Sequence, residues 1–433
     1  IEKEEVGGTC LNWGCIPTKA LVASAEAFRK AGKLEDYGIE LFGHATPSLP
    51  KIMERKQRIV STQIRGIRSL FKSWGVRLVE GAGTLLGPGR IEVRGKDGAV
   101  EVVESDTVII ATGSRPAQLP LFPFDGKRIL SSNDAVTIDA LPRSLLIVGA
   151  GVIGCEFACI FRELGTEVTM VELMPRALST EDHEIAEVLE RELKKKKIKL
   201  LTGVKIERAE VRRESVHVFL GDGKELSAEK LLVSIGRSLN TGNIGLEEAG
   251  VRKGPRGEIL VNEKMETTVG GIYAVGDVTG GALLAHVASR EGVVAAGNAC
   301  GREERIDYSV IPAGIFTSPE IGSVGLREQQ AAERGIAVRT GRFPFRALGK
   351  AHAMGEIEGM IKVVSDAGTD KVLGVHCIGA HAADLVHEGA LAIKAGLTTR
   401  EVASMIHAHP TLAEGLMEAA EDVHGEAIHQ PKK

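Results

Sequence analysis

The stretch that decides the fold reads Leu145-Leu146-Ile147-Val148-Gly149-Ala150-Gly151-Val152-Ile153-Gly154. Its four apolar residues predict a buried strand, and its G-x-G-x-x-G turn opens a helix that we expect to run to about Leu164. A second strand, Val168–Val171, is closed by Glu172, near the spacing of ~20 residues expected after such a turn. This order predicts a dinucleotide-binding unit; the alternative is a glycine turn that only packs a helix.

The same unit indicates which dinucleotide it binds. We expect the pyrophosphate at the helix N-terminus, against the backbone of residues 149–154. Glu172 can accept hydrogen bonds from the ribose hydroxyls, and a carboxylate there repels a 2′-phosphate, so NAD is favoured over NADP. Cys155 and Cys159 lie one turn apart in the same helix. We expect both of these cysteines to pack in the core.

Working outward from this unit, the chain divides into four segments, 1–142, 143–270, 271–307 and 308–433. A length of 433 residues suggests two to four domains. We expect the first and third segments to pack as one domain, and short strands in the first segment include one at 76–80. The fold class is therefore α/β, with two Rossmann-like dinucleotide-binding domains and an α+β C-terminal domain.

Composition excludes several classes of protein. The net charge of −4 offers no basic footprint for nucleic acid. We find no signal peptide and no apolar stretch long enough to cross a bilayer, so we expect no membrane partner. Six cysteines in 433 residues do not make a secreted disulfide scaffold. A reducing cytoplasm or organelle matrix is the expected location.

The most informative cysteines lie in Gly7-Gly8-Thr9-Cys10-Leu11-Asn12-Trp13-Gly14-Cys15-Ile16-Pro17-Thr18-Lys19. Two thiols at C-x₄-C spacing can close a small ring at a helix N-terminus, where the dipole and free N–H groups favour thiolate. Pro17 suits the first helical turn. The alternatives are half of a zinc site or two unrelated buried cysteines. Zinc would need a second Cys/His pair, and none is evident, so we expect a redox pair and no metal.

This cysteine stretch resembles the active site of the pyridine nucleotide–disulfide oxidoreductases. Within that family it is most similar to the members that oxidise dihydrolipoamide, whose pattern is GGTCLNxGCIPSK; Thr18 replaces the usual Ser. The resemblance covers the whole chain, 1–433, with the motifs in the family's order. It implies that Cys10 is the interchange thiol that meets the substrate. Cys15 is then the charge-transfer thiolate against the flavin, and Lys19 contacts the flavin.

Further motifs resemble the family's cofactor sites. Ala111–Pro116 is similar to its ATGSxP turn, Gly276-Asp277 to its second flavin motif and Leu283–His286 to its MLAH stretch. The FAD contacts that the resemblance implies are Glu2, Lys19, Gly83, Thr112, Gly113, Ser114, Asp277, Leu283, Leu284, Ala285 and His286. The NAD contacts that it implies are Gly149, Gly151, Gly154, Glu156, Glu172, Val204 and Gly236. Segments 1–142 and 271–307 would then form the FAD domain, and 143–270 the NAD domain.

The family's first flavin motif has no counterpart in this sequence. Glu2 matches the acidic residue that binds the adenosine ribose, and the glycine turn before it would lie ~20 residues upstream. We therefore expect a chain shortened by about one βα unit, with weakened or lost FAD binding. The rival interpretation is a flavin-free chain that only binds NAD or partner subunits.

The segment His407-Ala408-His409-Pro410-Thr411-Leu412-Ala413-Glu414 is the other specific signal. A histidine oriented by a carboxylate suits proton exchange with a dithiol. The resemblance implies that His409 is the base and Glu414 its partner, whereas His407 is expected to be structural. The family's interface domain, here 308–433, supplies this base to the opposite subunit, which implies a C2 homodimer.

These features predict oxidation of protein-bound dihydrolipoamide to lipoamide through a Cys10–Cys15 disulfide and FAD, with NAD⁺ as acceptor. The expected partners are lipoyl domains of 2-oxoacid dehydrogenase complexes or the glycine-cleavage H protein. The rivals within the family are glutathione, mercuric and related reductases. Glu172 argues against the NADP-dependent glutathione type. The tail Gln430–Lys433 lacks the cysteine pair that the mercuric type uses.

Overall fold

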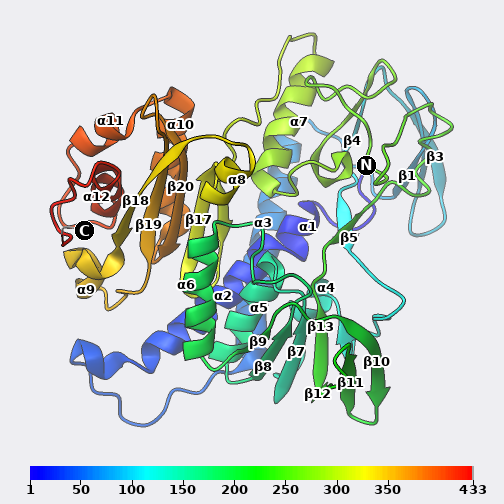
Figure 1. The fold of residues 1–433 in the computed structure, drawn as a ribbon. Coiled ribbons are helices and arrows are strands. Elements are labelled where there is room, and N and C mark those ends of the chain that lie inside the picture. The colour runs from blue at the N-terminus through cyan, green and yellow to red at the C-terminus, as the bar shows by residue number, and fades with distance from the viewer. Residues whose placement is uncertain (432–433) are drawn as a thin grey trace.

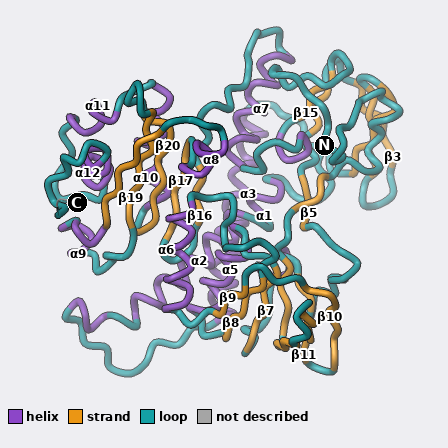
Figure 2. The backbone as a smooth tube through the Cα atoms, viewed as in Figure 1, coloured by secondary structure: helices purple, strands orange, loops and turns teal. Residues whose placement is uncertain are grey.

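The structure is a computed structural model that describes residues 1–431; the tail Gln430–Lys433 therefore extends two positions outside the described residues. Figure 1 shows a C-terminal sheet with its helices on one side and a parallel sheet at the bottom. The N-terminal region lies opposite the C-terminal sheet, and helices α2 (Cys15–Ala31), α3 (Leu49–Ser73) and α5 (Val152–Glu163) run between them (Figures 1 and 2). Within residues 1–431, none of the helices has the length and apolar character that a membrane span requires.

A five-stranded parallel sheet forms around the glycine turn. In spatial order its strands are β6 (Ile129–Leu130), β13 (Lys230–Val233), β7 (Ser144–Val148), β8 (Glu167–Val171) and β9 (Lys199–Leu201). Leu145, Leu146 and Ile147 are at most 1% exposed because both faces of the sheet are covered. The covering elements are α4 (Ser132–Ala135), α5, α6 (His183–Lys195) and the antiparallel strands β10 (Ile206–Arg212), β11 (Ser215–Leu220) and β12 (Glu225–Ala228). The predicted strand–turn–helix–strand unit is confirmed.

The N-terminal region joins segments that are far apart in the sequence. Strands β1 (Ala82–Gly87), β2 (Arg90–Arg94) and β3 (Val100–Glu104) form an antiparallel sheet. Two further pairs are the parallel β4 (Val108–Ile110) and β15 (Ile272–Ala274), and the antiparallel β5 (Ser114–Pro116) and β14 (Arg237–Leu239). Its other elements are α1 (Gly8–Asn12), η1 (Leu34–Tyr37), η2 (Gly276–Thr279) and α7 (Ala285–Ala299). The β4–β15 pair joins a strand of the first segment to a strand of the third.

The structure differs from the predicted segment 143–270 at both ends. Strand β6 belongs to the parallel sheet, so that unit begins before residue 143. After Gly236 the chain returns to the N-terminal region, where β14 pairs with β5 and Leu246 and Ile259 share a buried cluster with Val108. The predicted boundaries are misplaced because a local apolar pattern indicates a strand but not the sheet that the strand joins.

The predicted strand at 76–80 is wrong. Only Glu80 pairs, in an isolated bridge with Glu2. The Glu2 N–H donates to the Val79 carbonyl at 2.9 Å, and the Gly81 N–H donates to the Glu2 carbonyl at 2.8 Å. Because only Glu2 of the N-terminal segment pairs with residues 76–80, these residues form a single bridge and not a β-strand.

The C-terminal region is an α+β unit, as predicted. Its antiparallel sheet runs in the order β16 (Ala313–Ile315), β17 (Glu320–Gly325), β20 (Val372–Gly379), β19 (Met360–Asp366) and β18 (Val338–Pro344). Helices α10 (Ala382–Ala395), α11 (Thr399–Ser404) and α12 (Glu414–Asp422) share one buried cluster with this sheet. The short elements α8 (Glu328–Glu333), η3 (Phe345–Ala347) and α9 (Gly349–Ala353) complete the region.

A buried ion cluster joins the C-terminal sheet to α6. Lys362 on β19 is 1% exposed, and its Nζ lies 3.0 Å from both carboxylate oxygens of Asp182, the N-cap of α6. Nζ also lies 2.6 Å from Glu328. Burial opposes ionisation of Asp182, but Lys362 and other neighbours more than offset this and hold the pKa of Asp182 below its ordinary value.

Replacing Lys362 by Met should destabilise the protein by about 3–5 kcal/mol, because Asp182 would remain buried without its cation. Urea unfolding measures this difference, with Lys195→Met as the control, since Lys195 is 57% exposed in its pairs with Glu192 and Glu358. A carboxyl with a lowered pKa stabilises the fold above its unfolded pKa of ~3.9, and that contribution is lost as the pH falls further. The difference in free energy of unfolding between wild type and Lys362→Met should therefore narrow at acid pH. Equal urea midpoints of the two proteins at pH 7 would show that the Lys362–Asp182 pair does not stabilise the fold.

Candidate active site

The two cysteines of the glycine-rich stretch lie where two helices meet. Cys10 belongs to the five-residue α1, and Cys15 begins the 17-residue α2. Both are free, half-buried thiols in this structure. A Cβ at Gly14, between the helices, would come within 3.0 Å of the Thr9 carbonyl oxygen, which explains the glycine there. The predicted position of Cys15 at a helix N-terminus is confirmed.

The two thiols are electrostatically unlike. The hydrogen bond from Cys10 lowers the pKa of Cys15 to about 6. Burial opposes this shift, and the Lys19 ammonium assists it. The same hydrogen bond, together with burial, raises the pKa of Cys10. The pair therefore holds one thiolate and one thiol at neutral pH, with the negative charge on Cys15.

Lys19 is fixed by a carboxylate from another region. Its Nζ lies 2.8 and 2.9 Å from the two carboxylate oxygens of Glu156 on α5, which is 4% exposed. Glu156 also accepts the Phe316 N–H at 2.9 Å, and Lys19 Nζ lies 4.5 Å from the centre of the Phe316 ring. Lys19 and Glu156, predicted for different cofactors, are thus direct neighbours. Phe316 was not predicted.

A second polar cluster surrounds Ser114 and Asp277. The Ser114 hydroxyl donates to the Asp277 carboxylate, joining the two predicted flavin motifs. Arg237 donates from Nε to Ser114 Oγ at 2.6 Å and from Nη2 to the Ser114 carbonyl at 2.9 Å. Burial lowers the pKa of Arg237, while the charges of Asp277 and Cys15 act in the opposite direction. Arg237 was not among the predicted site residues, although it directly follows Gly236, a predicted NAD contact.

The glycine turn has the geometry that a bound pyrophosphate requires. Gly149 has φ of 95°, and a Cβ at Gly154 would lie 2.0 Å from the Gly149 carbonyl oxygen, so a side chain is excluded at both positions. The Glu172 carboxylate accepts the Ala150 N–H at 2.6 Å and the Met174 N–H at 2.7 Å. The Val204 N–H donates to the Glu172 carbonyl at 2.9 Å. Hydrogen bonds therefore hold the glycine turn, Glu172 and Val204 together at one edge of the parallel sheet.

The other predicted flavin contacts lie on separate elements. A Cβ at Gly83 on β1 would come within 3.3 Å of the Ile1 side chain, which places Gly83 beside the segment of Glu2. Leu284 is the N-cap of α7, and the preceding Leu283 is 40% exposed. His286 Nε2 lies 2.8 Å from the Pro312 carbonyl oxygen, so that nitrogen faces the connection to β16.

The predicted base and its partner are in contact. His409 Nδ1 lies 2.9 Å from Glu414 Oε1, and the Thr411 N–H donates to Glu414 Oε2 at 2.8 Å. Burial opposes ionisation of Glu414, but these two donors hold its pKa below the ordinary value. With Nδ1–H donated to Glu414, Nε2 is the basic nitrogen, and the side chain is 77% exposed.

His407 has a different environment. Its side chain is 3% exposed, with Nε2 at 2.8 Å from Glu388 and Nδ1 at 3.0 Å from the Met405 carbonyl oxygen. Both nitrogens are engaged, which supports the expected structural role. Figure 1 shows α11 and α12, which flank both histidines, on the side of the C-terminal sheet away from α1. Among the described residues, neither histidine makes a hydrogen bond or ion pair with Cys10 or Cys15 of its own chain.

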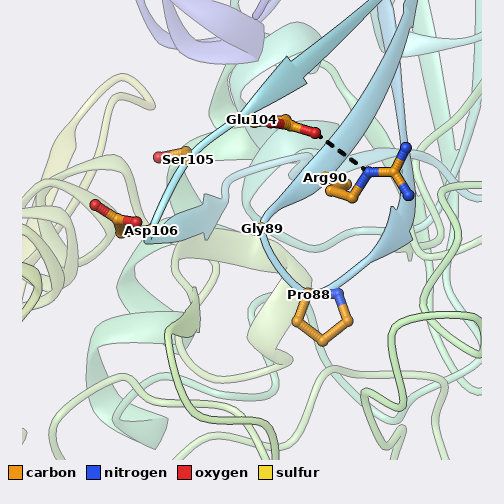
Figure 3. A pocket seen from close by; sticks show the side chains of 6 residues that line it. All are labelled: Pro88, Gly89, Arg90, Glu104, Ser105 and Asp106. Carbon is orange, nitrogen blue, oxygen red and sulfur yellow. Dashed lines mark ion pairs between the residues drawn. The ribbon is translucent and has the colours of Figure 1, made fainter.

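One open hollow lies away from these groups. It is lined by Pro88, Gly89, Arg90, Glu104, Ser105 and Asp106 (Figure 3). An ion pair of 3.5 Å joins Arg90 and Glu104 across β2 and β3. None of the predicted site residues lines this hollow, so it is not part of the candidate active site.

Comparison with known proteins identifies the family of the chain. Residues 1–292 match the pyridine nucleotide-disulphide oxidoreductase family, and residues 311–420 match its dimerisation domain. The chain therefore belongs to the pyridine nucleotide-disulphide oxidoreductases, flavoproteins whose cofactors are FAD and NAD(H). Within that family it groups with the dihydrolipoyl dehydrogenases, since relatives of that name match over its whole length.

Individual relatives show how far the similarity extends. The chain is 43% identical to dihydrolipoyl dehydrogenase of Bacillus subtilis, over 99% of this chain and 93% of that protein. It is 37% identical to a mitochondrial dihydrolipoyl dehydrogenase of Arabidopsis thaliana, over 99% and 86%. Among solved structures, LpdA from Mycobacterium tuberculosis has a TM-score of 0.89 at 31% identity, covering 97% of this chain and 92% of that one.

The described residues fit a flavin. Ser114 and Asp277 supply a hydroxyl and a carboxylate for polar groups, and Arg237 supplies a cation beside them. Gly113 has φ of 67°, and a Cβ there would meet nothing within 4 Å, which leaves open space at the turn. Ile109 on β4 is 39% exposed and offers apolar surface in the same region. These features suit a flat cofactor with a polar chain.

Proposed function

We propose that Cys10 and Cys15 carry the oxidation of dihydrolipoamide in this protein, with NAD⁺ as the final acceptor. The observation that supports this assignment most strongly is the unequal charge of the two thiols at the N-terminus of α2. A pair of this kind suits thiol–disulfide exchange, because the cysteine with the low pKa is the better leaving group.

The exchange conserves electrons among the sulfurs. In the oxidised pair, a substrate thiolate attacks Cys10 Sγ, and Cys15 leaves as a thiolate stabilised by the helix N-terminus and Lys19. The second substrate thiolate then attacks the substrate sulfur of the mixed disulfide, and the bond from that sulfur to Cys10 Sγ breaks. Cyclic lipoamide is released, and both cysteines are left reduced, holding two electrons. The chemistry that FAD supplies when bound is transfer of this electron pair to NAD⁺ as hydride.

The remaining predicted residues bind and orient the cofactors in this proposal. Lys19, Ser114 and Asp277 would hold FAD, with Glu156 fixing the position of Lys19. The turn at residues 149–154 would hold the NAD pyrophosphate, and Glu172 its adenosine ribose.

His409 completes the site as the general base. Its Nε2 takes the proton of the substrate thiol, and Glu414 orients the ring and stabilises the imidazolium. Because His409 is exposed and the helices that flank it lie on the side of the C-terminal sheet away from α1, we assign it to the active site of a second subunit in a C2 homodimer. The dimerisation domain supports a homodimer. The electron donors would be lipoyl domains of multienzyme complexes.

The purified protein provides the direct test. The proposal expects a yellow protein that reduces NAD⁺ with dihydrolipoamide and gains a long-wavelength absorption band on two-electron reduction. A colourless protein that binds NAD but gives no lipoamide-dependent turnover would instead support the flavin-free alternative.

Glu172 provides a separate prediction. Glu172→Ala should lower kcat/KM for NAD⁺ by about 10–100-fold, because a charge-assisted hydrogen bond to ribose and the support of the turn are both lost. Preference over NADP⁺ should fall in parallel, since the repelling carboxylate is gone. Initial rates with each coenzyme measure the effect. Glu167→Ala is the control, because Glu167 lies at the start of β8 and its side chain is 67% exposed. An unchanged ratio of kcat/KM for NAD⁺ to kcat/KM for NADP⁺ in Glu172→Ala would rule out the assignment of Glu172 to the ribose.

A further inference from the structure

Glu291 is a buried carboxylate that the proposed chemistry does not use. It lies in the middle of α7 and is 2% exposed. Its Oε2 accepts the Gly276 N–H at 2.6 Å, and its Oε1 accepts the Tyr308 hydroxyl at 2.6 Å. Neither partner is a cation. Burying a carboxylate on neutral donors alone is costly, so its position next to a cofactor turn is informative.

The Gly276 N–H belongs to the turn that carries Asp277. Gly276 begins η2 with φ of 75°, a conformation that favours glycine. On either side of this N–H, the turn is tied to the N-terminal region by Val275 N–H to the Ile110 carbonyl and by Ile259 N–H to the Val278 carbonyl, each at 3.0 Å. The contact with Glu291 ties the turn to α7 instead. The contact is made by the residue that directly precedes Asp277 in η2.

Tyr308 holds Glu291 from the opposite side. It lies in the connection between α7 and β16, where the C-terminal region begins. Burial and the neighbouring Glu291 carboxylate raise the pKa of Tyr308, so the hydroxyl remains a donor at neutral pH. The chain Tyr308–Glu291–Gly276 thus runs from that connection to the flavin turn.

We propose that Glu291 is a positioning residue of the flavin site, which acts on FAD binding through the Gly276 N–H and Asp277. The inference rests on the proposed function, in which Asp277 contacts FAD. It requires that the effect of Glu291 on FAD binding disappear when Asp277 is absent. A role in packing α7 alone requires no such dependence.

The test is FAD binding to apoprotein, measured by quenching of flavin fluorescence. Glu291→Ala should weaken binding by about 10–100-fold, the effect expected from loss of a charge-assisted hydrogen bond. Glu291→Gln should bind within about threefold of wild type, because its amide can still accept from Gly276 and donate to Tyr308. Glu303→Ala, at an 82% exposed glutamate near the end of α7, is the matched control.

The double variant distinguishes positioning from packing. In an Asp277→Ala background, adding Glu291→Ala should cause less than about a twofold further loss. Full additivity of the two losses, or wild-type binding by Glu291→Ala, would overturn the inference. If Asp277→Ala itself bound FAD normally, the proposed function of Asp277 would fail, a result that the single variants identify separately.

If Glu291→Ala does not fold, the variants Glu291→Met and Glu291→Gln test the inference instead. Glu291→Met keeps the length of the side chain and removes the acceptor, whereas Glu291→Gln keeps both. The inference expects weak FAD binding only in the Met variant, with similar unfolding temperatures of the two apoproteins. Equal FAD affinities for Met and Gln would overturn it.

Discussion

Replacement of Cys10 by Ser should lower kcat for dihydrolipoamide oxidation by at least about 10³-fold, because removal of the sulfur that the substrate thiolate attacks abolishes the covalent step. A serine hydroxyl cannot form the Cys10–Cys15 disulfide or the mixed disulfide with substrate. Binding of FAD and NAD should change little, since within residues 1–431 no hydrogen bond or ion pair joins Cys10 to the Ser114–Asp277 cluster or to the glycine turn. Steady-state rates with dihydrolipoamide and flavin titration of the same sample measure both quantities.

The spectrum of this variant tests the assignment of the charge to Cys15. In Cys10→Ser the serine hydroxyl can replace the Cys10 thiol as the hydrogen-bond donor to Cys15, and the start of α2 and Lys19 remain beside it. The thiolate and its long-wavelength band should therefore persist at neutral pH in this variant. Because the pKa of Cys15 is lowered to about 6, the wild-type band should fade as the pH falls through that value. Cys300→Ser, at an exposed cysteine, is the control. Lipoamide turnover close to wild type in Cys10→Ser would contradict the mechanism.

The parts of the site that were predicted correctly depend on local backbone geometry. The C-x₄-C stretch places Cys15 at a helix start because Pro17 and the glycines allow little else there. The glycine turn and Glu172 come together because a strand, a tight turn and a second strand bring them to one edge. His409 and Glu414 are neighbours because the loop before α12 is short.

The parts that were missed depend on contacts between distant segments. Lys19 meets Glu156 across two regions, and Arg237 reaches Ser114 through the β5–β14 pair. Glu291 looks like one more charged residue on an alanine-rich helix until the structure brings it to Gly276. A local pattern carries no information on such pairings. The same limit explains the misplaced boundaries of segment 143–270.

His409→Gln should lower kcat by about 10²–10⁴-fold, the contribution typical of a general base. The amide can fill the space of the ring but cannot accept and return a proton at neutral pH. Glu414→Gln should also lower kcat, by up to about 10⁴-fold, because the amide can donate to Nδ1 and so favour the wrong tautomer of the imidazole. The pH profile of kcat/KM measures the base directly, and its acid limb should be lost in His409→Gln. An unchanged profile would show that another group takes the proton.

The same two variants decide which subunit supplies the base. If His409 acts on the Cys10 of its partner, a heterodimer of one Cys10→Ser and one His409→Gln subunit contains one intact site, because the wild-type cysteine and the wild-type histidine meet across the interface. Co-expression of the two inactive chains in equal amounts should then restore about a quarter of wild-type turnover, from one active site in each of the heterodimers that make up half of the population. If His409 served its own chain, every site would lack one of the two groups and no activity would return. Recovery of activity therefore requires the crossed arrangement, which is proposed from the exposure of His409 and from the position of α11 and α12 on the side of the C-terminal sheet away from α1.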